Sequence, residues 1–400
     1  MLIFLIVSVS LIIFSVLKSF YRLVRVYKFL LSSRASEDKS TECNGKKIDI
    51  IIPVYNETKT VGNSIRYFSK LENYCNVFYV TTSKEASKAT YKEILYLMDK
   101  YKTKNIFLDN CPNTAGTMAT QLNYIAKKLP DDSIIGIYNI DSFPKSNTFK
   151  YVLNNIRKGG PLQQVSYFND DKKFIMSSAQ NWQNRWSVVY ELGKYISKAK
   201  LNFTYTIGHG LFIYKSDLDK YGYWSDKEIN EDNELGYRIL INNDKIRPIP
   251  FFEQAGFAKN LSVYIKQQST WFNGPLYAFS YYKKNKKSFR NFLLSCLNFK
   301  AAVSWLLYPI FSLIVFILGF AFNYCHVSIV LFVAMISYLT VINYLSYKIL
   351  KKYIPTLNYS STSVLTDLFF FLIHSFGPCL TLFKVLLRKN TIKNKYNTEK

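Results

Sequence analysis

The chain has 400 residues, a formal net charge of +25 and a hydrophobic content of 49%. This length exceeds the usual size of one domain, and the apolar residues gather at both ends, which argues against a single soluble domain. The basic excess favours anionic partners, and beside hydrophobic ends these are expected to be lipids and phosphorylated substrates, with no nucleic acid. The six cysteines and three histidines show no paired spacing, which disfavours a zinc site or a disulfide framework.

The first predicted element is a membrane anchor. Residues 2–17 are apolar and uncharged, and a basic flank begins at Lys18. The positive-inside rule places that flank in the cytoplasm. Because no basic leader or cleavage site accompanies the apolar stretch, we expect an uncleaved anchor that extends toward Phe20 or lies tilted. Residues 1–45 are therefore predicted to form a transmembrane anchor with a basic juxtamembrane segment.

The region 46–272 is predicted to fold as an α/β domain. Four short apolar runs predict strands at residues 48–54, 77–80, 106–108 and 134–138. Between them, apolar residues at helical spacing predict helices over residues 91–98 and 122–129. Strands separated by helices imply a mixed, mostly parallel sheet with flanking helices. Ligands of such sheets bind beyond the carboxyl ends of the strands.

The last part of the chain is predicted to return to the membrane. Residues 273–300 form a basic segment, which either binds acidic headgroups or is a solvated loop. Residues 301–322 and 327–347 are each long enough to span a membrane and predict a helical hairpin. The block 364–387 carries a Gly-Pro pair in its middle, so a full span and a broken, re-entrant element both stay open.

These elements predict a multi-pass protein of the cell membrane with three or four spans. Residues 301–400 are expected to contain transmembrane or re-entrant helices and a basic tail. Because basic residues flank both the anchor and the hairpin, the central domain is expected in the cytoplasm.

Polar residues follow the first and the fourth predicted strand, where ligands of a parallel sheet bind. Pro53, Tyr55 and Glu57 end the first run, and Asn139 and Asp141 follow the fourth. A carboxylate at a strand end suits Mg²⁺ or Mn²⁺, because these cations take oxygen ligands and bridge to phosphate oxygens. Capping of a turn is the alternative role of Asp141.

In this order the motifs resemble those of family 2 glycosyltransferases with the GT-A fold. The layout of anchor, cytoplasmic domain and C-terminal helices is similar to the processive membrane branch, which includes cellulose, hyaluronan and poly-N-acetylglucosamine synthases. The resemblance covers about residues 48–274. It implies a GT-A-type domain at 46–272 that transfers a sugar, with inversion, from a nucleotide-sugar donor.

The resemblance also implies a role for each motif residue. Pro53, Tyr55 and Glu57 correspond to residues that contact the nucleotide, and Asn139 and Asp141 stand at the family's DxD motif. Asp141 is thereby the predicted ligand of Mg²⁺ or Mn²⁺. Asn139 replaces the first aspartate of that motif and keeps a carbonyl oxygen but no charge.

Asp232 is the predicted catalytic residue, because it lies in a Glu-Asp motif that heads a helix and carries the general base in the family. Carboxylates at that place also stabilise the helix dipole. Acceptor contacts are implied for Gly208, His209, Gly210, Glu231, Gln267 and Trp271.

Four positions depart from the family pattern. Thr81 stands in a segment that lacks an aspartate for the nucleotide base, and Met118 replaces a lysine at a helix start. Asn139 is the third departure. Thr270 replaces an arginine suited to clamping a diphosphate. These departures fit either a different donor specificity or a weakened enzyme.

The leading hypothesis is an enzyme that extends a growing glycan or a lipid-linked acceptor at the membrane, in cell-surface polysaccharide synthesis. One alternative is a transferase that puts a single sugar on a lipid carrier. Another is a non-catalytic, sugar-nucleotide-binding subunit of a synthase complex. A transporter is disfavoured because too few spans are present. A synthase with so few helices is expected to need a partner subunit for polymer export.

Overall fold

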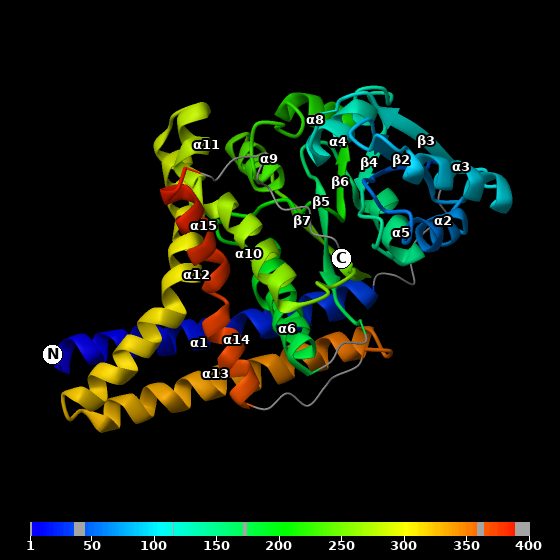
Figure 1. Ribbon diagram of the computed structural model, residues 1–400. Helices are drawn as coiled ribbons and strands as arrows, with labels where there is room; N and C mark the ends of the chain where they lie inside the picture. The colour runs from blue at the N-terminus through cyan, green and yellow to red at the C-terminus, as the bar shows by residue number, and fades with distance from the viewer. Residues whose placement is uncertain (1, 36–44, 115, 171–173, 358–363, 389–400) are drawn as a thin grey trace. The chain divides into compact units, whose positions relative to one another are not determined.

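The computed structural model describes residues 2–35, 45–114, 116–170, 174–357 and 364–388 (Figure 1). The chain divides into two compact units. The helical unit comprises residues 1–30, 168–203 and 257–400, and the sheet unit comprises residues 31–167 and 204–256. Residues 168–203 and 257–272, which lie inside the predicted catalytic domain, therefore group with the helices.

The sheet unit is built on seven strands in the order β3-β2-β1-β4-β6-β5-β7. The strands are β1 (Ile48–Pro53), β2 (Cys75–Thr82), β3 (Ile106–Cys111), β4 (Ile134–Ile137), β5 (Leu162–Tyr167), β6 (Leu211–Tyr214) and β7 (Arg247–Gln254). Only β6 runs antiparallel to its neighbours, β4 and β5. The mixed, mostly parallel sheet and all four predicted strands are confirmed.

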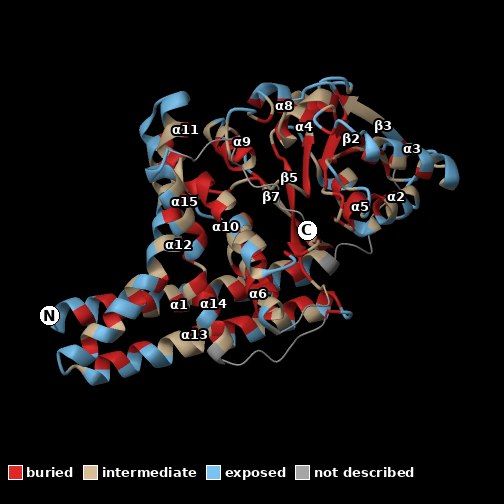
Figure 2. Ribbon diagram, in the orientation of Figure 1, coloured by how far each residue is buried: buried red, intermediate tan, exposed pale blue. Residues whose placement is uncertain are grey.

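Helices pack beside this sheet and enclose its core. They are α2 (Val61–Ser69), α3 (Ala89–Tyr101), α4 (Met118–Ala126), α5 (Ser146–Asn155), α8 (Lys215–Tyr221) and α9 (Glu231–Ile241). The two predicted helices correspond to α3 and α4. Strands β4 and β5 are buried along their whole length (Figure 2). Burial on both faces explains why β4 reads as a continuous apolar run. In β5 the buried polar side chains of Gln163 and Gln164 are instead satisfied by hydrogen bonds.

The helical unit contains the remaining helices. They are α1 (Leu2–Ala35), α6 (Phe174–Arg185), η2 (Trp186–Leu192), α7 (Gly193–Tyr195), α10 (Leu261–Leu276), α11 (Ala278–Lys284), α12 (Phe289–Ala321), α13 (Cys325–Tyr353), α14 (Val364–Ile373) and α15 (Phe376–Leu386). Most of α1 belongs to this unit. Within the residues that the structure describes, four stretches are long and apolar enough to cross a membrane, namely Leu2–Ser33, Phe289–Ala321, Cys325–Tyr353 and Thr366–Leu386.

Two of these helices are longer than predicted. Helix α1 continues well past Phe20, because no glycine or proline follows to end it before residue 35. Helix α12 begins at Phe289, inside the segment predicted as interfacial, and Ser288 caps it by accepting a hydrogen bond from the Asn291 amide at 3.1 Å. The basic segment is therefore largely helical.

The last hydrophobic block is interrupted, but not at its Gly-Pro pair. The break lies at residues 374–375, between α14 and α15, while Pro378 sits in the first turn of α15, where its missing N–H is tolerated. Gly377 instead permits a helix contact, because a Cβ there would lie 2.6 Å from the Cβ of Gln268 on α10. The Thr381 hydroxyl donates to the Ser269 carbonyl at 2.7 Å and fixes the same crossing.

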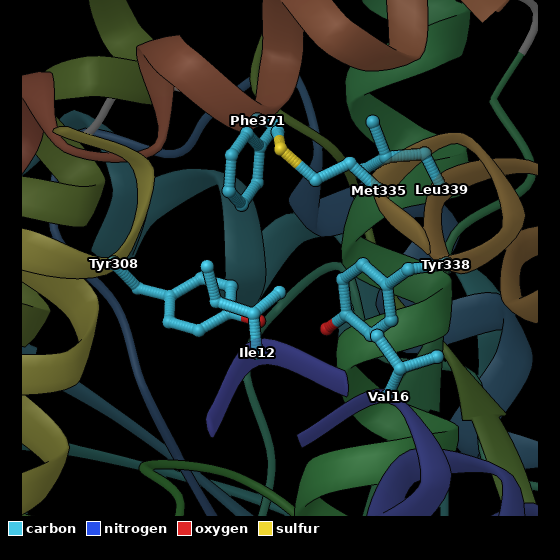
Figure 3. A pocket seen from close by; sticks show the side chains of 7 residues that line it. All are labelled: Ile12, Val16, Tyr308, Met335, Tyr338, Leu339 and Phe371. Atoms are coloured by element: carbon cyan, nitrogen blue, oxygen red, sulfur yellow. The ribbon is translucent and has the colours of Figure 1, made fainter. Parts of the chain in front are cut away.

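The interior of the helical unit contains an apolar pocket and the buried, positively charged side chain of Arg185. Side chains of α1, α12, α13 and α14, including Val16, Tyr308 and Phe371, line the pocket (Figure 3). Arg185, only 2% exposed, lies 3.6 Å from the Trp182 ring centroid and 4.9 Å from that of Tyr338. The two aromatic faces stabilise a charge that water does not reach.

Candidate functional site

Asp141 lies just beyond the carboxyl end of β4. The Ser142 amide donates to the Asn139 carbonyl at 3.1 Å and closes a turn, and the Phe143 amide donates to the Gln254 carbonyl at 2.8 Å. The Asp141 carboxylate packs against Gly256, where a Cβ would approach its Oδ2 to 2.4 Å. The absence of a side chain at residue 256 therefore makes the space that the carboxylate occupies.

The loop after β1 carries Tyr55 and Glu57 and turns sharply at Asn56, whose φ is +56°. Glu85, a buried carboxylate that the sequence analysis missed, accepts from the Asn56 amide at 3.4 Å and from the Thr90 amide at 2.8 Å. Tyr55 is partly exposed, and the Lys84 ammonium lies 4.9 Å from its ring centroid. Two of the predicted nucleotide-contact residues, Tyr55 and Glu57, thus lie in one loop that hydrogen bonds hold in place, and the third, Pro53, ends β1 directly before it.

At the end of β2, uncharged side chains form a hydrogen-bond network. Family 2 glycosyltransferases, which the sequence resembles, carry a carboxylate at this place. The Thr81 hydroxyl donates to the Asn110 side-chain carbonyl at 3.0 Å, and the Asn110 amide donates to the Ser83 hydroxyl at 2.9 Å. Thr81 itself is 1% exposed. Its side chain therefore joins β2 to β3, and Ser83 and Asn110 are the more accessible groups of this network.

Asp232 lies in the first turn of α9, as predicted. Asn230 caps the helix by accepting from the Asn233 amide at 3.2 Å. The Thr206 hydroxyl donates to the Asp232 carbonyl at 2.6 Å, and a Cβ on Gly208 would lie 3.3 Å from Asp232 Oδ2. The carboxylate therefore borders the Gly208 loop, which brings two of the predicted motifs together.

Gly236 sets how closely α9 approaches that loop. A Cβ at this position would lie 2.6 Å from the Cα of Tyr205 and 2.8 Å from the backbone nitrogen of Thr206. Both atoms belong to the backbone, so a side chain cannot be accommodated by a rotamer change. Only glycine allows the start of α9 to stay beside residues 205–208.

We expect Gly236→Ala to destabilise the protein, since overpacking of this kind costs about 1–3 kcal/mol. Gly62→Ala, in helix α2, is the matched control. Its Cβ would meet the Leu97 side chain of α3 at 3.8 Å, which is an ordinary van der Waals contact. That substitution should be neutral or stabilise by roughly 0.5–1 kcal/mol. Thermal unfolding of the purified variants measures both effects, and equal midpoints would contradict the close packing of α9.

The loop from Ile207 to Gly210 is held by β5 and β7. Gln163 donates to the His209 carbonyl at 2.8 Å and accepts from the Ile207 amide at 2.9 Å. Gly210 has a φ of +68°, a conformation that glycine adopts without strain. The His209 Nδ1 contacts the Glu253 carboxylate, which the sequence analysis did not single out.

A buried tyrosine lies near this carboxylate. Burial raises the pKa of the Tyr138 phenol well above its usual value, and the charge of Glu253 acts in the same direction. The Tyr138 hydroxyl donates to the Gln164 side-chain carbonyl at 2.5 Å. Tyr138 is therefore a permanent hydrogen-bond donor inside the sheet unit.

Gln267 and Trp271 belong to the helical unit, on α10. Their spacing of four residues places them on one face of that helix, and both are partly exposed. Thr270, between them, donates its hydroxyl to the Lys266 carbonyl at 3.2 Å. The two predicted contact residues therefore share one helical surface.

Asn139 and Asp141, which follow β4, are suited to bind a divalent cation whose remaining ligands are phosphate oxygens of a substrate and water. In the described part of the chain, no three His, Cys, Asp or Glu side chains are grouped to hold a metal alone. Asn139 and Asp141 offer an amide and a carboxylate. Mg²⁺ commonly binds one or two carboxylates and completes its shell with substrate phosphates and water. The space over Gly256 positions the single carboxylate that such a site requires.

The model of the family described as "Glycosyl transferase family group 2" matches residues 159–351, just under half of the chain. The chain is a glycosyltransferase. The matched part includes helix α9 with Asp232 and helix α10 with Gln267 and Trp271. A search among curated proteins gave no match.

A solved structure shares the fold of this glycosyltransferase, and another superimposes less closely. The mannosyltransferase PcManGT from Pyrobaculum calidifontis, in complex with GDP-Man and Mn²⁺, is 12% identical and superimposes with a TM-score of 0.51, over 94% of this chain and 99% of that chain. S. aureus TarS 1-349 in complex with UDP is 11% identical with a TM-score of 0.46, over 86% and 92% of the two chains. The glycosyltransferase has a GT-A-type fold accompanied by apolar helices.

Proposed function

We propose that the enzyme moves a sugar from a nucleotide-sugar donor to a growing glycan or lipid-linked acceptor at the membrane, with inversion, in cell-surface polysaccharide synthesis. The observation that carries this proposal is the place of Asp232. Its carboxylate lies at the start of α9 against the Gly208 loop, in the same unit as Asp141. An inverting transfer needs one carboxylate for the acceptor hydroxyl and another group to support the departing diphosphate.

The donor is proposed to bind along the carboxyl ends of β1 and β4. Pro53, Tyr55 and Glu57 lie at the β1 end, and Asn139 and Asp141 follow β4. The solved mannosyltransferase of the same fold, with bound GDP-Man, supports a nucleotide sugar as the ligand. The neutral side chains Ser83 and Asn110 near β2 and β3 would then contribute to the choice of nucleobase.

A divalent cation, Mg²⁺ or Mn²⁺, is proposed to accompany the donor. Asp141 would be its charged protein ligand, with Asn139 beside it. When bound, the cation neutralises charge on the departing nucleoside diphosphate. The Mn²⁺ in the mannosyltransferase complex supports this assignment.

The acceptor is proposed to approach Asp232 from the loop that contains Gly208, His209 and Gly210. Glu231, 7% exposed, precedes the base and supports the start of α9. In the helical unit, Gln267 and Trp271 on α10 are the proposed sugar contacts, because an exposed Trp face stacks on a sugar ring. Asp232 accepts the proton of the acceptor hydroxyl while that oxygen forms its bond to the sugar C1 and the diphosphate leaves.

The four apolar helices are proposed to span the cell membrane, with the sheet unit in the cytoplasm. In a background whose other cysteines are replaced by serine, an impermeant maleimide applied to intact cells should modify the exposed Cys325 at the start of α13. A cysteine introduced at the exposed Ser87 should react only after permeabilisation. Labelling of residue 87 in intact cells would contradict this orientation.

The function itself is tested by donor turnover. Purified membranes that contain the enzyme should release nucleoside diphosphate from at least one donor. They are supplied with Mn²⁺ or Mg²⁺ and a panel of UDP-, GDP- and other nucleotide sugars. If no donor is turned over in the presence of folded enzyme, the proposal of a catalytic subunit is wrong.

A further inference from the structure

Glu253 on β7 is a carboxylate with no solvent exposure. Its Oε1 accepts a hydrogen bond from the Ser166 hydroxyl on β5 at 2.8 Å, and the same oxygen contacts His209 Nδ1. His209 is the one basic side chain within ion-pair distance of Glu253 in the described part of the chain. Because a buried charge is strongly destabilising without a partner, the ring and the carboxylate form a mutually dependent pair.

The pair fixes which ring atom of His209 faces the carboxylate. An ionised carboxylate can only accept hydrogen bonds, so Nδ1 carries the proton that faces Glu253. Any contact between the imidazole and a substrate must then use Nε2. The His209 side chain is 16% exposed, whereas Glu253 is not accessible to a substrate at all.

Residues next to this pair in the sequence border both functional carboxylates. On one side, Gly208 precedes His209 and borders the Asp232 carboxylate. On the other side, Glu253 precedes Gln254, whose carbonyl accepts from Phe143, and Gly256, which borders Asp141. The titratable groups around the pair therefore include Asp232 on α9, and Tyr138 and Asp141 in the segment that follows β4.

We propose that Glu253 is a positioning residue that acts through His209, holding the imidazole so that Nε2 binds the acceptor sugar beside Asp232. The inference rests on the proposed function and deepens it by assigning the acceptor contact of the Gly208 loop to one ring nitrogen. No bond forms or breaks at either residue. The Asp232 carboxylate alone takes the proton of the acceptor hydroxyl.

The test compares two reactions of one enzyme, transfer to the endogenous acceptor in native membranes and hydrolysis of the donor by water. Glu253→Gln should lower transfer about 10- to 100-fold, because the amide no longer fixes which ring nitrogen carries the proton. Donor hydrolysis and the Kd of the matching nucleoside diphosphate should change less than about twofold. A loss of folded protein would instead lower both reactions in parallel.

A double substitution separates positioning from an independent role. His209→Gln should lose transfer at least as strongly, and adding Glu253→Gln to it should cause no further loss, because residues that act as a unit are not additive. Ser166→Ala removes the hydrogen bond to Glu253 and the 3.3 Å contact with His209 Nδ1 but keeps the contact between His209 and Glu253, so it is the matched control and should retain most transfer. Additive losses, or unchanged transfer in Glu253→Gln, would overturn the inference.

These outcomes are distinguishable from failure of the proposed function. If Asp232→Asn loses transfer while Glu253→Gln keeps it, the function stands and the positioning role is wrong. If neither transfer nor hydrolysis of any donor is detected with the unsubstituted enzyme, the proposed function itself has failed.

Discussion

Asp232→Asn is expected to abolish sugar transfer while donor binding stays nearly intact. Removal of a positioned general base typically costs about 10²- to 10⁴-fold in rate, because the acceptor hydroxyl must then attack with its proton retained. The proposed donor contacts lie at the ends of β1 and β4, so the loss should appear in kcat rather than in donor affinity. Single-turnover transfer and donor binding, measured on the same preparation, separate the two effects.

The alternative role of Asp232 predicts a far smaller change. A carboxylate in the first turn of a helix contributes about 0.3–1 kcal/mol to stability through the helix dipole. In α9, Asn230 already supplies the cap. Asp226→Asn, in the exposed turn before α9, is the matched control and should leave transfer unchanged. A folded Asp232→Asn enzyme with near-normal transfer would remove Asp232 from the mechanism.

The second large effect is expected from Asp141→Asn. Because Asn139 carries no charge, this substitution leaves the proposed metal site without a charged ligand, and metal ions supply several kcal/mol of charge stabilisation. A loss of about 10²-fold or more in kcat/KM, with a raised requirement for Mn²⁺, should follow, since each tenfold corresponds to about 1.4 kcal/mol. Donor turnover measured over a Mn²⁺ titration gives both quantities.

The control for this experiment lies at the other end of the same strand. Asp131 precedes β4, and its side chain is 83% exposed and paired with Lys215. Asp131→Asn should leave kcat/KM and the Mn²⁺ requirement unchanged, since Asp131 lies at the opposite end of β4 from Asp141 and Lys215 keeps its second partner, Asp219. Turnover that survives a chelator in the unsubstituted enzyme would show that the proposed metal has no role.

The sequence predicts much of this fold because its strongest signals are local. The β-branched runs at residues 48–54 and 134–138 become adjacent parallel strands, and the polar residues that follow them lie at one edge of the sheet. The resemblance of the Glu-Asp motif to that of family 2 glycosyltransferases places Asp232 at the start of a helix, and it lies in the first turn of α9. The position of a short motif at a strand end or a helix start can be predicted from sequence, because the strand before it or the helix after it determines where it lies.

Other features depend on pairings between distant segments. Glu253 follows no recognisable motif, and its role emerges only when β7 pairs with β5 across a register irregularity, which brings it to Ser166 and His209. Arg185 likewise reads as a surface residue at the end of a polar helix, yet helices α13 and α14 pack against α6 and bury it. For Gly377 the sequence leaves a full span and a broken helix both open, because its contact partner Gln268 is remote in sequence.

The anomeric configuration of the product tests the central claim most directly, because a single displacement assisted by Asp232 inverts the configuration at the sugar C1. With the donor identified from the nucleotide-sugar panel, NMR of the newly formed glycosidic bond in a single-turnover reaction should show a β-linkage from an α-linked donor. Retention of the α-configuration would contradict the single displacement and the role of Asp232 as its general base.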